Sequence, residues 1–219
     1  VDRPDIQFAT RRVAKGMASP SHLDWARLKR LGRYLIGKPR IALLYDWQVR
    51  PSGLRVQTKP KWAETALSVH TDADWAGDRQ SRQSVGGGAI YYGRHLLRTW
   101  SKEQSTIAPF SVEAELYAAN YGAQQTLGLQ SMAADLGCNL PSIGLEVDAN
   151  ATIGIIGWQG LGKVRHLHVA DLWLQDAVRK GRLILSKVPG TENTADPGTK
   201  PLTADAIETI LWRMGFSTP

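Results

Sequence analysis

Residues 69–75 read VHTDADW and place Asp72 inside the first β-strand that the sequence predicts, at residues 66–73. Two further strands are predicted at residues 85–92 and 96–101, and a turn at Gly93-Arg94 separates them. Strands so close in the sequence, joined by short links, are expected to pair as an antiparallel meander.

The remainder of the chain alternates between helices and strands. A long helix is predicted at residues 111–136, because Leu116, Ala119 and Ala123 share one face and Gly137 is a natural stop. Short apolar runs predict two buried parallel strands. The order β-β-β-α-β-α-α-β-α predicts an α/β fold with a five-stranded mixed sheet and helices on its faces. The elements predicted after the long helix are strands at 143–148 and 183–188 and helices at 150–158, 168–180 and 204–214.

The first part of the chain is basic and helical. Helices are predicted at residues 4–18 and 22–36, with Ser21 as the cap of the second. The composition changes near residues 50–62, so we divide the chain into an N-terminal segment, 1–62, and a main domain, 63–219.

The composition favours a folded protein with an anionic partner. The 219 residues are 42% hydrophobic, and the net charge is +7. A lone cysteine, Cys138, permits no internal disulfide and indicates a reducing, intracellular compartment: cytoplasm, nucleus or a particle assembled there. No apolar run approaches the length of a membrane span, so no membrane partner is expected.

Four carboxylates lie where this topology is expected to bring them together: Asp72 in the first strand, Glu115 early in the long helix, Asp148 at the end of the fourth strand and Asp196 after the fifth. Taken singly, each is more often a turn former, a cap or a helix-dipole partner. Together they suggest a metal site, since burying acids at strand ends is costly without a cation.

Clustered carboxylates repel one another, and a hard divalent cation such as Mg²⁺ removes that penalty. Two such ions can hydrolyse a phosphodiester, and four acids supply their shared ligands. A zinc site is not expected, because His166 and His168 are two positions apart and do not share a helix face.

Six motifs resemble the polyproteins of copia-type retrotransposons, in the order found there. TDADWAGD at 71–78 resembles SDADWAGD, and RQSVGG at 82–87 resembles RKSTSGY. WSKEQ at 100–104 resembles WSSKKQ, and SVEAELYAA at 111–119 resembles SSTEAEYIA. RHLHV at 165–169 resembles KHIDI, and ADPGTKPL at 195–202 resembles ADxxTKPL. Residues 3–6 and 22–35 resemble the end of that family's reverse transcriptase.

The resemblance implies a ribonuclease H domain behind a C-terminal remnant of the reverse transcriptase. It implies an RNase H-like fold and cleavage of the RNA strand of RNA–DNA hybrids with two Mg²⁺ ions, for which Mn²⁺ substitutes. The four acids map onto Asp72, Glu115, Asp148 and Asp196, as catalytic residues and metal ligands. The choice of Glu115 over Glu113 rests on the motif and on the inward-packing residues that follow Glu115.

Other expectations concern the substrate and partners. Polar groups beside the acids are candidate hybrid contacts, as are two cations, although each alone is more often a cap, a turn residue or a surface charge. Cations of segment 1–62 are expected to strengthen hybrid binding, unless Leu28, Leu31 and Leu35 only dock its helix onto the nuclease or onto a polymerase domain of the parent polyprotein. The candidate contacts are Thr71, Gln104, Ser111, Asn150, Lys102 and Arg82.

The chain departs from the ribonuclease H pattern at one point, and two alternative functions stay open. Residues 188–193 lack the histidine that many cellular ribonucleases H carry there, and slower turnover is expected. The alternatives are a catalytically inactive module of the same fold, which binds nucleic acid or acts as a scaffold, and an integrase-like DNA nuclease. The complete set of four acids favours an active ribonuclease H over both.

Overall fold

A computed structural model of the chain describes residues 3–45, 67–78, 81–140, 143–159 and 172–217. The RHLHV motif, the start of the helix predicted at 168, the whole piece between 50 and 62 and the boundary at residue 62 lie outside these ranges. None of the described helices is both long and apolar enough to cross a bilayer.

The central sheet has the strand order β4-β3-β2-β5-β6. β2 (Leu67–Asp74) pairs antiparallel with β3 (Val85–Tyr92), which pairs antiparallel with β4 (His95–Glu103). On its other side β2 pairs in parallel with β5 (Ile143–Val147), and β5 with β6 (Leu183–Lys187). This confirms the predicted fold class, an α/β RNase H-like fold with a five-stranded mixed sheet.

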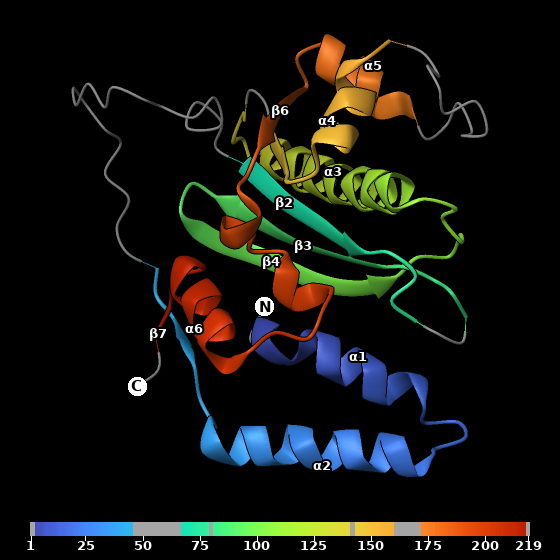
Figure 1. The fold of residues 1–219 in the computed structure, drawn as a ribbon. Helices are drawn as coiled ribbons and strands as arrows, with labels where there is room; N and C mark the ends of the chain where they lie inside the picture. The colour runs from blue at the N-terminus through green and yellow to red at the C-terminus, as the bar shows by residue number, and fades with distance from the viewer. Residues whose placement is uncertain (1–2, 46–66, 79–80, 141–142, 160–171, 218–219) are drawn as a thin grey trace.

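Helices cover both faces of the sheet (Figure 1). On one face lie α3 (Ser111–Asp135), α4 (Asn150–Gly157) and α5 (Trp173–Arg179). Leu116, Ala119 and Ala123 of α3 are buried there in the larger apolar core, as their spacing predicts. On the other face α6 (Ala204–Arg213) packs against β3 and β4 in a second apolar cluster that includes Ala89, Tyr91 and Leu96.

The N-terminal segment is helical, as predicted. A 3-10 turn, η1 (Pro4–Ile6), leads into α1 (Gln7–Lys15), and α2 follows (His22–Gly37). Ser21 caps α2: its side chain accepts a hydrogen bond from the backbone N–H of Asp24, whose carboxylate in turn accepts from the Ser21 N–H.

Helix α1 packs against β4 mainly through polar groups. Gln7 Nε2 donates to Thr99 Oγ1 at 2.7 Å, and Arg11 Nε donates to Ser101 Oγ at 3.1 Å. Lys15 Nζ lies 2.8 Å from Asp78 Oδ2. Of the three leucines expected to dock α2, Leu31 and Leu35 are partly buried, whereas Leu28 is exposed.

Two short strands were not predicted. β1 (Ala42–Leu43) pairs antiparallel with β7 (Phe216–Ser217), and Leu43 packs against the cluster beneath β3. The end of the described chain therefore holds the N-terminal segment against the main domain.

Candidate active site

The site lies at the carboxyl ends of β2 and β5, where the chain order of the sheet reverses. From β2 the chain runs outward to β3 and β4, then returns to place β5 on the opposite side of β2. Such a switch point leaves a crevice at the strand ends, which is where open α/β sheets bind ligands. Asp72 lies near the end of β2, and Asp148 directly follows β5.

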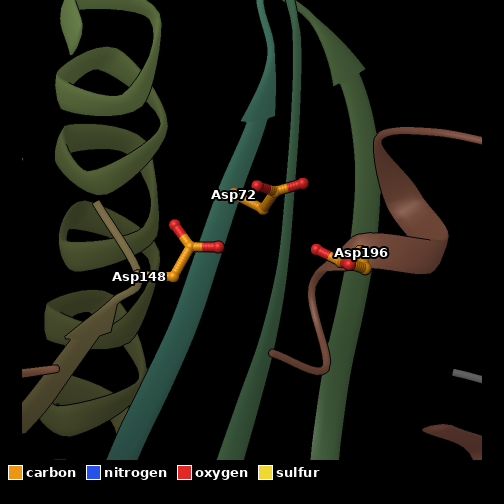
Figure 2. A group of neighbouring side chains, drawn as sticks. All are labelled: Asp72, Asp148 and Asp196. Carbon is orange, nitrogen blue, oxygen red and sulfur yellow. The ribbon is translucent and has the colours of Figure 1, made fainter. Parts of the chain in front are cut away.

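Three aspartates converge there. Asp72, Asp148 and Asp196 each offer one carboxylate oxygen, and these oxygens lie within 4.8 Å of one another. Figure 2 shows Asp148 and Asp196 approaching Asp72 from opposite sides. Asp196 begins the 3-10 turn η5 (Asp196–Gly198), which packs against β3. The structure thus brings together three of the four predicted acids in a group that can hold a metal ion.

The fourth acid, Glu115, reaches the same place from α3. Its Oε1 accepts a hydrogen bond from the backbone N–H of Ala73 at 3.3 Å, beside Asp72. Its Oε2 is buried and has no hydrogen-bond partner among the described residues. Glu115 therefore joins the aspartates as the fourth member of an acidic cluster, a name that we keep below for Asp72, Glu115, Asp148 and Asp196.

Burial and repulsion disfavour the charged forms of three of these acids, Glu115, Asp148 and Asp196. Burial, and then the charges of Asp72 and Asp148, raise the pKa of Glu115 to about 9. Burial and then Asp72 raise the pKa of Asp196 to about 6, against the opposing effect of Lys200. The pKa of Asp148 is raised for the same two reasons. The cluster holds more negative charge than its surroundings stabilise.

Two neighbours that the sequence did not single out contact the cluster directly. The hydroxyl of Thr199, a fully buried residue, donates a short hydrogen bond to Asp72 Oδ2. Lys200 Nζ lies 3.0 Å from Asp196 Oδ1 and 3.6 Å from Asp72 Oδ2. Both residues belong to the ADPGTKPL motif, and Lys200 supplies one positive charge to four acids.

Asn193 links the loop of Asp196 to the strands, and the sequence did not single it out either. Its Nδ2 donates to the carbonyl of Thr71 at 3.0 Å, and its Oδ1 accepts from the N–H of Ala195 at 3.1 Å. A side-chain hydrogen bond from Asn193 partly opposes the rise in the pKa of Asp148 that burial and Asp72 cause. This residue is fully buried and thus orients three segments of the site.

The expectation that inward packing favours Glu115 over Glu113 does not hold. Glu113 is fully buried, so inward packing does not distinguish the two side chains. The contacts of the two side chains distinguish them. Glu115 accepts a hydrogen bond from the backbone N–H of Ala73, and burial and then the charges of Asp72 and Asp148 raise its pKa.

Two of the six candidate substrate contacts share a cavity of about 580 Å³ between β4 and α3. Lys102 Nζ lies 4.2 Å from the ring centroid of Tyr121, and Gln104 Nε2 donates to the carbonyl of Ala114 at 2.8 Å. Asn120 also lines this cavity.

The other four candidates are placed apart from that cavity. Thr71 is fully buried, and its methyl group lies on the side of β2 that faces Gly122 of α3, so it offers no surface to a substrate. Ser111 is exposed at the first position of α3, and Arg82 is exposed in the turn before β3. Asn150 Oδ1 accepts from Lys187 Nζ at 2.7 Å.

The residues of the cluster fit a divalent metal ion. They offer only carboxylate oxygens, the hard ligands that Mg²⁺ prefers. The unpartnered Oε2 of Glu115 and the raised pKa values show that the site lacks positive charge. A divalent cation held by these carboxylates would supply that charge.

Comparison with known proteins relates the chain to transposons. No family model matches it. It is 26% identical over 217 residues to the retrovirus-related Pol polyprotein from transposon RE1 of Arabidopsis thaliana, covering 98% of this chain and 14% of that protein. It is 30% identical over 129 residues to the secreted RxLR effector protein 161 of Plasmopara viticola, covering 59% of this chain and 81% of that protein.

Among solved structures, LC11-RNase H1 in complex with an RNA/DNA hybrid is similar with a TM-score of 0.44 and 17% identity, over 66% of this chain and 99% of that chain. The chain spans about one seventh of the transposon polyproteins that it matches. These relatives agree with the resemblance drawn from the six motifs: they are retrovirus-related Pol polyproteins from transposons, and they are similar to this chain over 94–98% of its length.

Proposed function

We propose that the chain is a ribonuclease H, which hydrolyses the RNA strand of RNA–DNA hybrids with two divalent metal ions during reverse transcription of a retrotransposon. The observation that carries the proposal is the convergence of Asp72, Asp148, Asp196 and Glu115 at the switch point of the sheet. Kinship with Pol polyproteins supports it, since such a polyprotein provides the reverse transcription.

The acidic cluster holds the ions in this proposal. Bound divalent ions supply the Lewis-acid chemistry that phosphodiester hydrolysis requires; Mg²⁺ is the proposed ion, with Mn²⁺ as a substitute. The chain contributes orientation: Thr199 fixes one oxygen of Asp72, and Asn193 ties Asp148 to the loop of Asp196. Lys200 holds Asp196 and Asp72 together.

Partners and location follow from the same proposal. The substrate is an RNA–DNA hybrid, Lys102 and Gln104 are its first candidate contacts beside the acids, and the polymerase domain of the parent polyprotein is a further partner. Residues 1–62 are proposed to be the remnant of that polymerase, and residues 63–219 the nuclease. The proposed setting is intracellular, in the cytoplasm or a virus-like particle.

The chain is expected to cut a labelled RNA–DNA hybrid in the RNA strand only. Cleavage should require Mg²⁺ or Mn²⁺ and stop when EDTA removes them, because the cluster alone cannot activate water. Gel analysis of hybrid, double-stranded DNA and double-stranded RNA gives the measurement. Cutting of DNA duplex instead would favour the integrase-like alternative, and hybrid binding without cutting would favour the inactive module.

Gly87→Ala is expected to impair cleavage although it leaves all four acids of the cluster in place. Gly87 is the register partner of Asp72, and a Cβ there would lie 2.8 Å from the carbonyl oxygen of Ala195 and 2.8 Å from Thr199 Cγ2. The segment that carries Asp196 must therefore shift. We expect a loss of roughly 1–3 kcal/mol in unfolding free energy and, since displacement by about 1 Å can cost 10²-fold, a large loss of rate.

Gly86→Ala is the matched control. A Cβ at Gly86 would make only ordinary contacts, at 3.5 Å from Ala118 Cβ and 3.6 Å from Gln104 Nε2. Urea unfolding and hybrid cleavage are compared for both variants. Equal damage from the two substitutions, or none from Gly87→Ala, would show that close packing at Gly87 does not position Asp196.

A further inference from the structure

A second cavity, of about 510 Å³, adjoins the acidic cluster. Two of its walls come from α1 and α2 of the N-terminal segment, and two from η5 and α6 of the main domain. Figure 1 shows α1 and α2 on the same side of the sheet as α6. Lys200 and Asp74 line the cavity, and Lys200 also contacts Asp196 and Asp72. The cavity and the cluster therefore share a wall.

The walls of this cavity are largely apolar. Phe8 of α1, Leu31 of α2, Pro201 and Ile207 of α6 line it, and all except Pro201, which is exposed, are partly buried. Its volume lies within the range of about 300–1,000 Å³ that is common for small-ligand sites, and such sites combine apolar walls with a few polar groups. A flat, apolar group such as a nucleobase suits these walls.

The cavity also contains two acids. Asp5 is buried, lies 2.9 Å from Arg3 Nη2 and accepts a hydrogen bond from the Tyr34 hydroxyl at 2.7 Å, so its charge is paired. Burial and then the charge of Asp72 raise the pKa of Asp74, while Lys200, Arg11 and Arg12 oppose the rise.

Against these two acids, four cations line the cavity: Arg12, Arg27, Arg30 and Lys200. Three of these have a carboxylate partner: Arg12 pairs with Asp78, Arg27 with Asp24 and Lys200 with Asp196. Within the described ranges Arg30 forms no ion pair, and its side chain is exposed. A phosphate group is the anion that nucleic acid offers to such a guanidinium.

From this combination we infer that the cavity binds one nucleotide of the strand that passes the acidic cluster, with its base against Phe8 and Leu31 and its phosphate at Arg30. The inference rests on the proposed nuclease function and extends it. It assigns the N-terminal segment a part in substrate binding that the main domain cannot supply alone, because α1 and α2 form half of the site.

Adenosine 5′-monophosphate is the first probe, titrated into the full chain in EDTA so that no metal ion can bridge it to the acids. Calorimetry gives the affinity, and NMR shift changes locate the site. We expect binding that shifts Phe8 and Leu31, with adenosine alone and inorganic phosphate each at least about tenfold weaker, since each lacks one half of the contacts. Shifts confined to other residues, or no binding, would overturn the inference.

Two variants test the named contacts. Arg30→Ala should weaken binding of the nucleotide about tenfold, as expected for loss of a charge-assisted hydrogen bond. Leu31→Trp should abolish binding by filling the cavity. Arg33→Ala is the control, because Arg33 is an exposed arginine of the same helix outside the cavity wall. If Leu31→Trp fails to fold, Arg30→Ala and Arg33→Ala still test the inference, and equal nucleotide affinities of these two variants would overturn it.

Hybrid cleavage links the site to the substrate. Arg30→Ala should raise KM about fivefold or more with kcat unchanged, because it removes binding and leaves the acids intact. An unchanged KM, despite nucleotide binding by the parent chain, would overturn the inference. The nucleotide titration needs no cleavage, so its failure is distinguishable from failure of the proposed function, which would appear as an intact hybrid in Mg²⁺.

Discussion

Replacing Asp148 by asparagine is expected to reduce hybrid cleavage by about a thousandfold or more, because loss of one metal ligand removes several kcal/mol of stabilisation from the transition state. The fold should survive. Asp148 is partly exposed, directly follows β5 and has a pKa raised by burial and by Asp72, so its charge works against the metal-free protein. We expect a metal-free Tm equal to that of the parent or higher.

Asp135→Asn provides the comparison, since Asp135 is an exposed carboxylate at the end of α3, far from the strand ends. Cleavage rates under saturating Mg²⁺ and thermal melts in EDTA are measured for both variants. Cleavage by Asp148→Asn within tenfold of the parent rate would remove Asp148 from the proposed ligands. A large drop in Tm would assign it a structural role instead.

The metal-free protein is expected to lose stability as the pH rises from 7 to 9. In the folded chain the carboxyl of Glu115 has a pKa raised to about 9, whereas in the unfolded chain it ionises near pH 4.5. Across this window the folded state binds more protons than the unfolded state, so the free energy of unfolding falls with pH. We expect the Tm to fall by about 5 °C or more over these two pH units.

Mg²⁺ should flatten this pH dependence and raise the Tm at pH 9 most, because an ion bound at the cluster stabilises the ionised acids. Glu115→Gln should flatten it without any metal, while Glu192→Gln, at an exposed position, should leave the slope unchanged. Melts at pH 7, 8 and 9, with and without Mg²⁺, measure the slopes. A metal-free Tm that rises with pH, or a slope kept by Glu115→Gln, would contradict the proposed repulsion within the cluster.

The strands and helices were predictable because local chemistry encodes them. β3 begins and ends at the predicted residues, and Ser21 caps α2 as its position indicated. Thr203 caps α6 in the same way, because its hydroxyl oxygen accepts a hydrogen bond from the N–H of Ala206. β1 and β7 were not predictable. Each has two residues, which is too short for a periodic pattern, and their pairing depends on tertiary packing alone.

The acids were easier to find than the groups that hold them. Asp72 and Asp148 lie at or near strand ends, Glu115 lies early in α3, and Asp196 follows β6, so topology predicts that they meet. The choice of Glu115 over Glu113 needed the motif as well. Thr199 and Lys200 depend instead on the turn of η5, which carries their side chains back to Asp72. The buried position of Glu113 was missed because both glutamates lie in the first turns of α3, where spacing alone does not determine direction.

The contact between α6 and the end of α2 also has a consequence for the order of events during synthesis. Lys38 Nζ pairs with Glu208 Oε1 at 3.0 Å across 170 positions of the chain. At ribosomal rates of about 5–20 residues per second, roughly 10–30 s separate the emergence of the two partners. During this interval Ile41 and Leu43 cannot pack against the apolar side chains of α6. The end of α2 thus leaves the ribosome well before α6, which packs beside it, and a chaperone has a long opportunity to bind at residues 38–43.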